Sequence, residues 1–130
     1  MALPPPPKHL KVTLKGEVGV KYSNLTGIYH LKEIKINGKP FWSHKLKNKA
    51  IWYHKEEESW CISDSSAIGS DNFFIVGPFG NQNWPQNISN MWRFKDNHCL
   101  IDDSRGEFIE LEECSDASST DFSKGNFLDK

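Results

Sequence analysis

Residues 27–45, which read GIYHLKEIKINGKPFWSHK, carry the strongest fold signal in the chain. Asn37-Gly38 is the dipeptide preferred in a two-residue type I′ hairpin turn, because both central positions of that turn need a positive φ. Aromatic and β-branched residues flank the dipeptide, and such residues fit a pleated sheet. Pro40 stands where a strand begins, a position that tolerates the missing N–H. We therefore predict an antiparallel hairpin of residues 27–36 and 39–45, with an irregularity near the middle of its first strand.

The same alternation of short apolar runs and turn signals continues on both sides of this hairpin. Further strands are expected at residues 10–14, 50–55, 59–63, 72–76, 91–95, 98–101 and 107–111. About nine short antiparallel strands at near-regular spacing are typical of a meander, a sandwich or a barrel-like sheet. No segment has the periodicity of a helix. The sequence therefore predicts an all-β fold in a single small domain.

A chain of 130 residues fits one domain of this kind and can bury a core of its own. We divide it into a Pro-rich leader at 1–8, a β domain at 9–113 and a flexible acidic tail at 114–130. The run Pro4–Pro7 favours polyproline II, so the leader is expected to be stiff and unpacked. The first residues do not have the apolar core of a secretory signal, and no apolar run approaches the roughly 20 residues of a membrane span. These features favour the cytoplasm slightly and leave the compartment unknown.

Four short motifs follow one another in a fixed order along the first half of the chain. They are Gly27-x-Tyr29, Asn37-Gly38-x-Pro40-x-Trp42, Ile51-Trp52-Tyr53 and Trp60-x-Ile62. This order resembles a small β-rich module, with no assigned activity, that recurs in modular proteins of protists and marine invertebrates. The resemblance spans roughly Thr13 to Phe94. It implies a β-rich fold and a modular role, and it carries over no catalytic residue.

The aromatic residues suggest two candidate surfaces. Trp84 stands beside Asn83 in a polar loop, where its ring could stack on a sugar or on a partner's proline, or could fold back onto the core as a plug. The Lys-rich hairpin 39–55 is the second candidate, although large aromatic residues in strands usually fill a core. The candidate ligand-binding residues are therefore Trp84, Asn83, Trp42, His44, Trp52 and His54.

Charge is distributed unevenly along the chain. Residues 1–55 hold eleven Lys and two Glu, whereas residues 56–130 hold five basic and fifteen acidic residues. Lysines interleaved with aromatics are typical of proteins that bind single-stranded nucleic acid. The sequence pI near 6.5 and the acidic second half argue against that partner. Nucleic acid is therefore not expected as a ligand.

The residues that could carry chemistry show no recognised spacing. His44 and His54 could face each other across the turn at Lys47–Lys49 and hold a metal together with a Glu or with Cys99, but no H-x-H or H-x-x-x-H pattern supports this. The chain also has no nucleophile elbow and no phosphate-binding loop. We therefore predict no catalytic residue, no metal and no cofactor. The odd number of cysteines predicts reduced thiols, with a Cys61–Cys99 bridge as the alternative.

These observations favour a non-catalytic binding or interaction module, above all for a protein partner. One alternative is an extracellular carbohydrate-binding module that uses loop aromatics, which the sequons Asn24-Leu-Thr26 and Asn87-Ile-Ser89 would permit. A second alternative is a small enzyme of unknown class, which would need a deep pocket with convergent titratable groups. The protein is not expected to bind a membrane.

Overall fold

The computed structural model describes residues 4–80, 83–88, 91–103 and 105–115. Its strands are β1 (His9–Leu14), β2 (Gly27–Ile36), β3 (Lys39–His44), β4 (Lys49–His54), β5 (Ser59–Asp64), β6 (Phe73–Val76), β7 (Trp92–Asp96), β8 (Cys99–Asp103) and β9 (Ile109–Glu113). The helical elements are α1 (Gly16–Lys21), η1 (Ser23–Leu25), η2 (Ser65–Ala67) and η3 (Pro85–Asn87). The predicted all-β domain of about nine strands is thereby confirmed.

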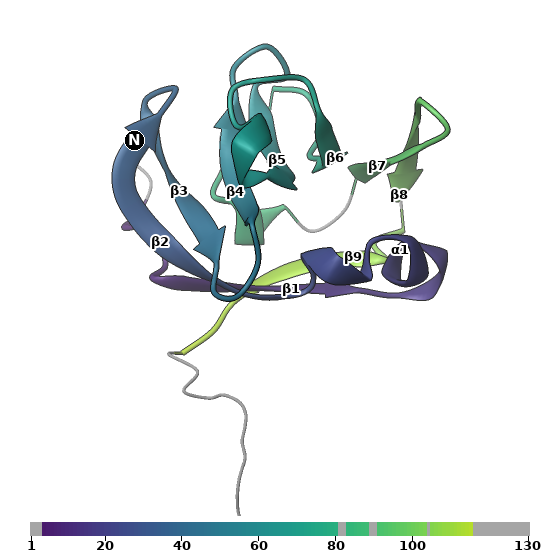
Figure 1. Ribbon diagram of the computed structural model, residues 1–130, viewed down its shortest axis with the longest axis horizontal. Coiled ribbons are helices and arrows are strands. Elements are labelled where there is room, and N and C mark those ends of the chain that lie inside the picture. The colour runs from purple at the N-terminus through teal and green to yellow at the C-terminus, as the bar shows by residue number, and fades with distance from the viewer. Residues whose placement is uncertain (1–3, 81–82, 89–90, 104, 116–130) are drawn as a thin grey trace, which may run out of the picture.

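The nine strands form one antiparallel sheet in the order β8-β7-β6-β5-β4-β3-β2-β1-β9. Strands β1 to β8 follow one another as a meander, and β9 returns to pair with the first strand. The sheet curves until it nearly closes into a barrel-like shape, with β1 and β9 opposite β4 and β5 (Figure 1). It stays open because β8 and β9 are its two ends. The predicted residues 116–130 of the tail lie outside the described residues.

The hairpin predicted at residues 27–45 forms as expected. Asn37 and Gly38 have φ angles of 56° and 83°, as a type I′ turn requires. The pairing of β2 with β3 shifts between Lys32 and Ile36, which is the irregularity expected in the first strand. Such a shift bends a strand and increases its twist, and it contributes to the curvature of the sheet.

The inner face of the curved sheet holds the main core, because alternate residues of each strand point to it. Its largest side chains are four tryptophans and three tyrosines that come from five strands and two connecting segments. The group consists of Trp42, Trp60, Trp84, Trp92, Tyr22, Tyr29 and Tyr53. Trp42, Trp60 and Trp84 lie with ring centres 5.4 to 6.1 Å apart. This aromatic cluster dominates the interior of the domain.

A second, smaller core lies on the outer face of β3–β6. It contains Ala50, Trp52, Cys61, Phe73 and Val76, with Ile36, Phe41 and Ile68 packed against it. Burial raises the pKa of the Cys61 thiol, which keeps it protonated. The three cysteines are free thiols, so the Cys61–Cys99 bridge does not form.

The Pro-rich leader packs against the core, so the expectation of an unpacked leader is wrong. Pro7 is buried, and its carbonyl accepts a hydrogen bond of 2.8 Å from Nε1 of Trp42. The Pro4 carbonyl accepts a hydrogen bond of 2.6 Å from Nε1 of Trp84. The buried indole N–H groups need acceptors, and the leader supplies two of them. The composition of the leader alone could not show that its carbonyls accept hydrogen bonds from buried tryptophans.

The short helix α1 was not predicted, because six residues are too few to show helical periodicity. Helix α1 buries Val18. Its last residue, Lys21, places its Nζ 3.1 Å from Oδ1 of Asp96, which ends β7. The Tyr22 hydroxyl donates to the Lys95 carbonyl at 2.6 Å. The α1 segment therefore supports the β7–β8 hairpin. Within the described residues, no helix combines the length and the hydrophobicity needed to cross a membrane.

Candidate binding surfaces

Most residues predicted to bind a ligand are buried. Only Asn83 is exposed, and the exposed fractions of the other five lie between 0 and 9%: Trp42, His44, Trp52, His54 and Trp84. These side chains therefore form no exposed aromatic patch on hairpin 39–55 or on the polar loop. The alternative expectation, that the large rings fill a core, is the one that holds.

Trp84 is the plug that the sequence left as one of two alternatives. Its ring packs against Trp42 and Trp60, and its exposed fraction is 7%. The neighbouring Asn83 carbonyl accepts the indole N–H of Trp60 at 2.5 Å. Trp84 lies in the segment between β6 and β7, and its ring is part of the inner core. The Asn and Gln residues around Trp84 did not indicate that its ring points into the core.

His44 and His54 lie on opposite faces of the sheet. In the β3–β4 pairing Ser43 faces Ala50, which sets the centre of the connecting turn between residues 46 and 47. His44 therefore lies beside this turn, and His54 lies at the other end of β4. The ring of His44 packs on Tyr29 in the inner core, whereas that of His54 packs on Phe73 in the outer one. The predicted two-histidine pair does not form.

His44 is held in its neutral form by its hydrogen bonds. Its Nδ1 accepts the backbone N–H groups of Leu46 (2.9 Å) and Lys47 (3.2 Å), so the ring proton lies on Nε2 and is donated to the Thr26 carbonyl (2.8 Å). Burial lowers the pKa of His44 below its ordinary value, and the positive charge of Lys47 acts in the same direction.

Acidification is expected to destabilise the protein through His44. Because its pKa is lower in the folded than in the unfolded state, the unfolded state binds more protons as the pH falls below about 6.5. The free energy of unfolding, measured with urea from about pH 7.5 down to about pH 5, should therefore fall. A His44→Asn variant should lose part of this pH dependence, whereas a variant of the exposed His98, His98→Asn, should keep it. Equal slopes in all three proteins would contradict this assignment.

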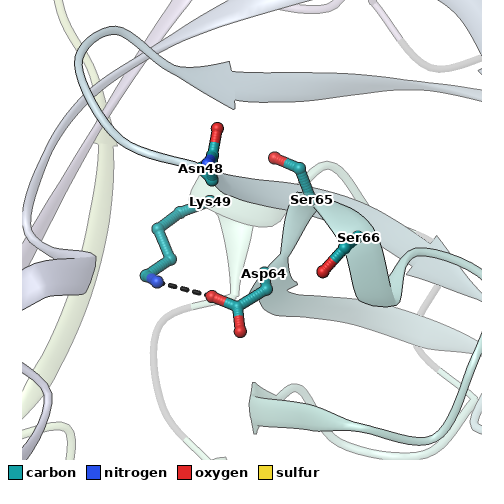
Figure 2. Close-up of a pocket in the computed structure, with 5 residues that line it drawn as sticks. All are labelled: Asn48, Lys49, Asp64, Ser65 and Ser66. Atoms are coloured by element: carbon teal, nitrogen blue, oxygen red, sulfur yellow. Dashed lines mark hydrogen bonds and ion pairs between the residues drawn. The ribbon is translucent and has the colours of Figure 1, made fainter.

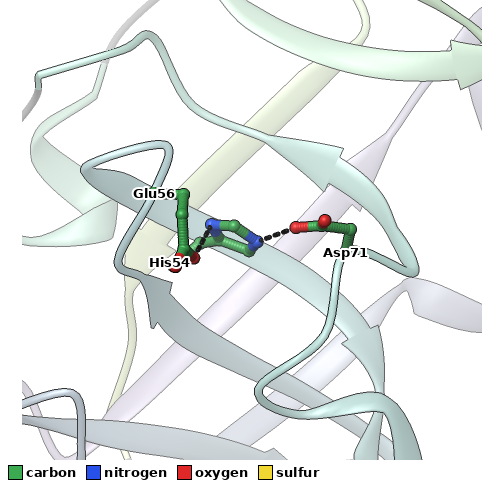
Figure 3. Close-up of side chains that lie close together, drawn as sticks. All are labelled: His54, Glu56 and Asp71. Carbon is green, nitrogen blue, oxygen red and sulfur yellow. Dashed lines mark hydrogen bonds and ion pairs between the residues drawn. The ribbon is translucent and has the colours of Figure 1, made fainter.

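His54 lies in a cluster with Glu56 and Asp71, here called the His54 cluster (Figure 3). Of all His, Cys, Asp and Glu side chains in the described ranges, these three form the one group whose ligand atoms lie within 4.8 Å of one another. Both ring nitrogens of His54 are engaged. Nδ1 accepts the N–H of Glu57 (3.2 Å), and the Nε2 proton is therefore donated to Asp71 (2.8 Å).

These two hydrogen bonds hold the chain segments around His54 together. A metal ion at either nitrogen would have to replace one of the two bonds, because a metal needs the lone pair of a ring nitrogen. The bond to Asp71 ties the loop before β6 to the end of β4, across the outer core. The geometry therefore favours a structural role for this histidine.

A polar hollow lies at the opposite end of β4 and β5 (Figure 2). It has a volume of about 660 Å³ and is lined by Asn48, Lys49, Asp64, Ser65 and Ser66. Lys49 and Asp64 form an ion pair across it with an N–O distance of 2.5 Å. Ligand pockets are usually lined mainly by apolar and aromatic side chains. A hollow with only polar residues, whose two charges already neutralise each other, is a weak candidate for a ligand site.

Strand β8 is a free edge of the sheet. It pairs with β7 on one side, and no described strand pairs with its other side. Its residues Cys99 to Asp102 are all exposed, including the apolar Leu100 (37%) and Ile101 (41%). The other end of the sheet is less open, because η3 packs against β9. Natural proteins usually protect apolar edge strands against pairing with other chains, so the exposed edge of β8 is a candidate binding surface.

The turn before β8 determines which backbone groups face outward. Asn97 and His98 both have positive φ and form a two-residue hairpin turn. In such a hairpin Asp96 and Cys99 form a hydrogen-bonded pair, and the pairing alternates along the strands. The N–H and C=O groups of Cys99 and Ile101 therefore face β7, and those of Leu100 and Asp102 face away from it.

Comparison with models of protein families, with curated proteins and with solved structures found no match for this chain. The resemblance to a β-rich module therefore stays a prediction.

Proposed function

We propose that this domain is a non-catalytic protein-binding module that pairs an extended segment of a partner protein with β8. The exposed, apolar and unpaired edge of this strand is the observation that carries the proposal. An added strand would use the outward N–H and C=O groups of Leu100 and Asp102. Main-chain hydrogen bonds supply affinity in this mode of recognition, and alternate side chains supply specificity.

The pairing of β7 with β8 indicates the chemistry of such a partner. On the β7 side, Arg93 faces Asp102 and Phe94 faces Ile101. A segment on the free side would meet the same two residues of β8. We therefore expect an extended segment with a basic residue opposite Asp102 and apolar residues beside Leu100 and Ile101. Cross-strand pairs of this kind contribute about 0.2–1 kcal/mol each.

The burial of Trp84 supports a protein partner over a carbohydrate. The carbohydrate alternative needed an aromatic ring displayed in a loop, and this ring lies in the inner core. Phe79 is exposed on the same loop, but it has no described aromatic neighbour with which to form a stacking platform. Three hollows lined by described residues are open and do not gather titratable groups around an enclosed space. An enzyme therefore receives no support from them.

The edge can be blocked without disturbing the sheet. A Leu100→Pro variant removes an N–H that faces outward and is not used in the pairing with β7, a position where edge strands tolerate proline. The matched Leu100→Ala variant keeps the N–H and shortens only the side chain. We expect eight-residue extended peptides with a central Lys-Val-Val segment, which places Lys opposite Asp102 and Val opposite Ile101 and Leu100 in an antiparallel pair, to bind the native protein, and Leu100→Pro to weaken binding at least about tenfold, or about 1.4 kcal/mol.

Titration calorimetry with these peptides gives the result. Leu100→Ala should weaken binding less than Leu100→Pro, because it leaves the main-chain hydrogen bonds in place. Circular dichroism should show that both variants keep the native fold. Peptide binding with equal affinity to Leu100→Pro and to the native protein would contradict strand addition at β8.

A further inference from the structure

We propose that Trp42 and Trp84 form a binding site for a polyproline II segment, which the chain's own leader fills in this structure and a proline-rich segment of a partner protein can take. Two hydrogen bonds carry the proposal. The Pro4 carbonyl accepts the indole N–H of Trp84 at 2.6 Å. The Pro7 carbonyl accepts the indole N–H of Trp42 at 2.8 Å. The site is separate from the β8 edge and does not depend on the proposed function.

The backbone of the leader favours polyproline II. Pro4, Pro5 and Pro6 are each followed by a proline. A proline ring fixes φ at about −65°, and a following proline disfavours the helical range of ψ. Polyproline II has about three residues per turn and rises about 3.1 Å per residue. The carbonyls of Pro4 and Pro7, one turn apart, therefore point to the same side of the segment, about 9 Å from each other.

The chemistry of the two indoles complements that of a proline segment. Residues 4–7 are all proline and have no backbone N–H, so they offer only carbonyl acceptors. The indole nitrogen is a donor only, and its ring is a large apolar surface. The rings of Trp42 and Trp84 lie 6.1 Å apart at an angle of 81°. Aromatic-lined grooves that bind proline-rich segments use the same combination, and the preformed helix lowers the entropy cost of binding.

The leader lies on the surface of the domain, where it can be exchanged. Burial increases along it from the exposed Pro4 to the buried Pro7. The next residue, Lys8, is exposed, and its carbonyl accepts the N–H of Leu31 at 2.9 Å, where the pairing of β1 with β2 begins. Rotation about the N–Cα bond of Lys8 would release the prolines and leave this hydrogen bond in place. The sheet therefore does not have to unpair for the leader to leave the two indoles.

An open hollow beside the leader indicates which proline-rich segments fit. It has a volume of about 570 Å³ and is lined by Pro5, Pro6, Pro7, Lys8, His9, Glu113, Cys114 and Ser115. Glu113 is exposed on the β9 side of this hollow. Its negative charge favours a basic residue next to the prolines, and Lys8 follows the prolines of the leader in the same way. We therefore expect the ligand to be a run of prolines followed by Lys or Arg.

The leader and a partner segment would compete for the same two indoles. Because the leader belongs to the same chain, its effective concentration at the site is high. Only molecules whose leader has left can bind the partner, so the apparent dissociation constant of the partner rises as that fraction falls. The leader is therefore a built-in competitor. Substitutions that weaken its docking should strengthen the binding of a free proline-rich peptide.

A synthetic peptide with the sequence of residues 2–8, Ala-Leu-Pro-Pro-Pro-Pro-Lys, is the probe. It is added to the native protein and to a full-length variant, Pro4→Gly/Pro5→Gly/Pro6→Gly, here called the open-leader variant, because glycine removes the polyproline II preference. We expect the peptide to bind the open-leader variant at least about tenfold more tightly than the native protein. In ¹H–¹⁵N spectra the indole signals of Trp42 and Trp84 should shift in this variant and return toward their native positions when the peptide binds.

Two further substitutions in the open-leader variant test the site itself. Trp84→Phe keeps an aromatic ring but removes the donor, and it should weaken peptide binding at least about tenfold. Trp52→Phe is the matched control, because its indole N–H donates to Oγ of Ser63 in the outer core at 2.8 Å. It should leave peptide binding unchanged, and circular dichroism should show the native fold in every variant.

Three results would each overturn the proposal. The first is a peptide that does not move the indole signals of Trp42 and Trp84 in the open-leader variant. The second is equal binding of a peptide in which alanine replaces every proline. The third is equal affinity of the proline peptide for the native protein and for the open-leader variant, because the leader would then not compete for the site.

Discussion

Replacement of Trp42 by alanine is expected to lower the free energy of unfolding by about 3–5 kcal/mol, a typical cost for removing a buried Trp side chain. Trp42 is fully buried and contacts both Trp60 and Trp84. Its loss would leave a cavity in the centre of the aromatic cluster. It would also leave the Pro7 carbonyl without its indole donor. Domains of this size have about 5–15 kcal/mol of stability, so the variant should be near the limit of folding.

Urea unfolding followed by far-ultraviolet circular dichroism measures this loss. Leu46→Ala is the control, because Leu46 is 86% exposed and its truncation should change the stability by less than about 0.5 kcal/mol. A Trp42→Ala variant as stable as Leu46→Ala would contradict the placement of the aromatic cluster in the core.

Replacement of Asp103 by alanine is expected to cost about 3 kcal/mol or more. The Asp103 carboxylate is buried and accepts the backbone N–H groups of Glu107, Phe108 and Ile109 at 2.9 to 3.0 Å. These bonds fix the connection between β8 and β9, the two ends of the sheet. Leaving a buried donor unsatisfied costs about 1–3 kcal/mol. Alanine would deprive the buried N–H of Ile109 of its acceptor, and also the partly buried N–H groups of Glu107 and Phe108.

The neighbouring Asp102 supplies the control for this prediction. It is exposed on the same strand, and Asp102→Ala should change the free energy of unfolding by less than about 0.5 kcal/mol. Amide hydrogen exchange should show Glu107, Phe108 and Ile109 losing protection only in Asp103→Ala. Similar stability of the two variants would show that the β8–β9 connection does not depend on the carboxylate.

Local sequence signals were sufficient to predict the strands. The Asn37-Gly38 turn, the alternating runs and the charged residues Glu56–Glu58 each act within a few residues, and the structure contains all nine expected strands. The return of β9 to β1 could not be predicted in this way. This pairing joins residues about 100 positions apart, and alternation does not specify a partner.

The candidate site was harder to predict for the same reason. The sequence correctly allowed Trp84 as a plug, but only the three-dimensional arrangement shows that Pro4 and Asn83 supply acceptors to the indoles of the cluster. The prediction that His44 and His54 face each other was wrong. It assumed a turn midway between the two histidines, whereas the turn is centred between residues 46 and 47, closer to His44.

Amide hydrogen exchange, with and without the Val/Lys peptides, tests the central claim most directly. In the free protein the amides of Leu100 and Asp102 should exchange rapidly, because they face the open edge, while those of Cys99 and Ile101 should be protected by β7. Bound peptide should protect Leu100 and Asp102 selectively. If both amides are already protected in the free protein, or if the peptide protects other strands instead, β8 is not the binding edge.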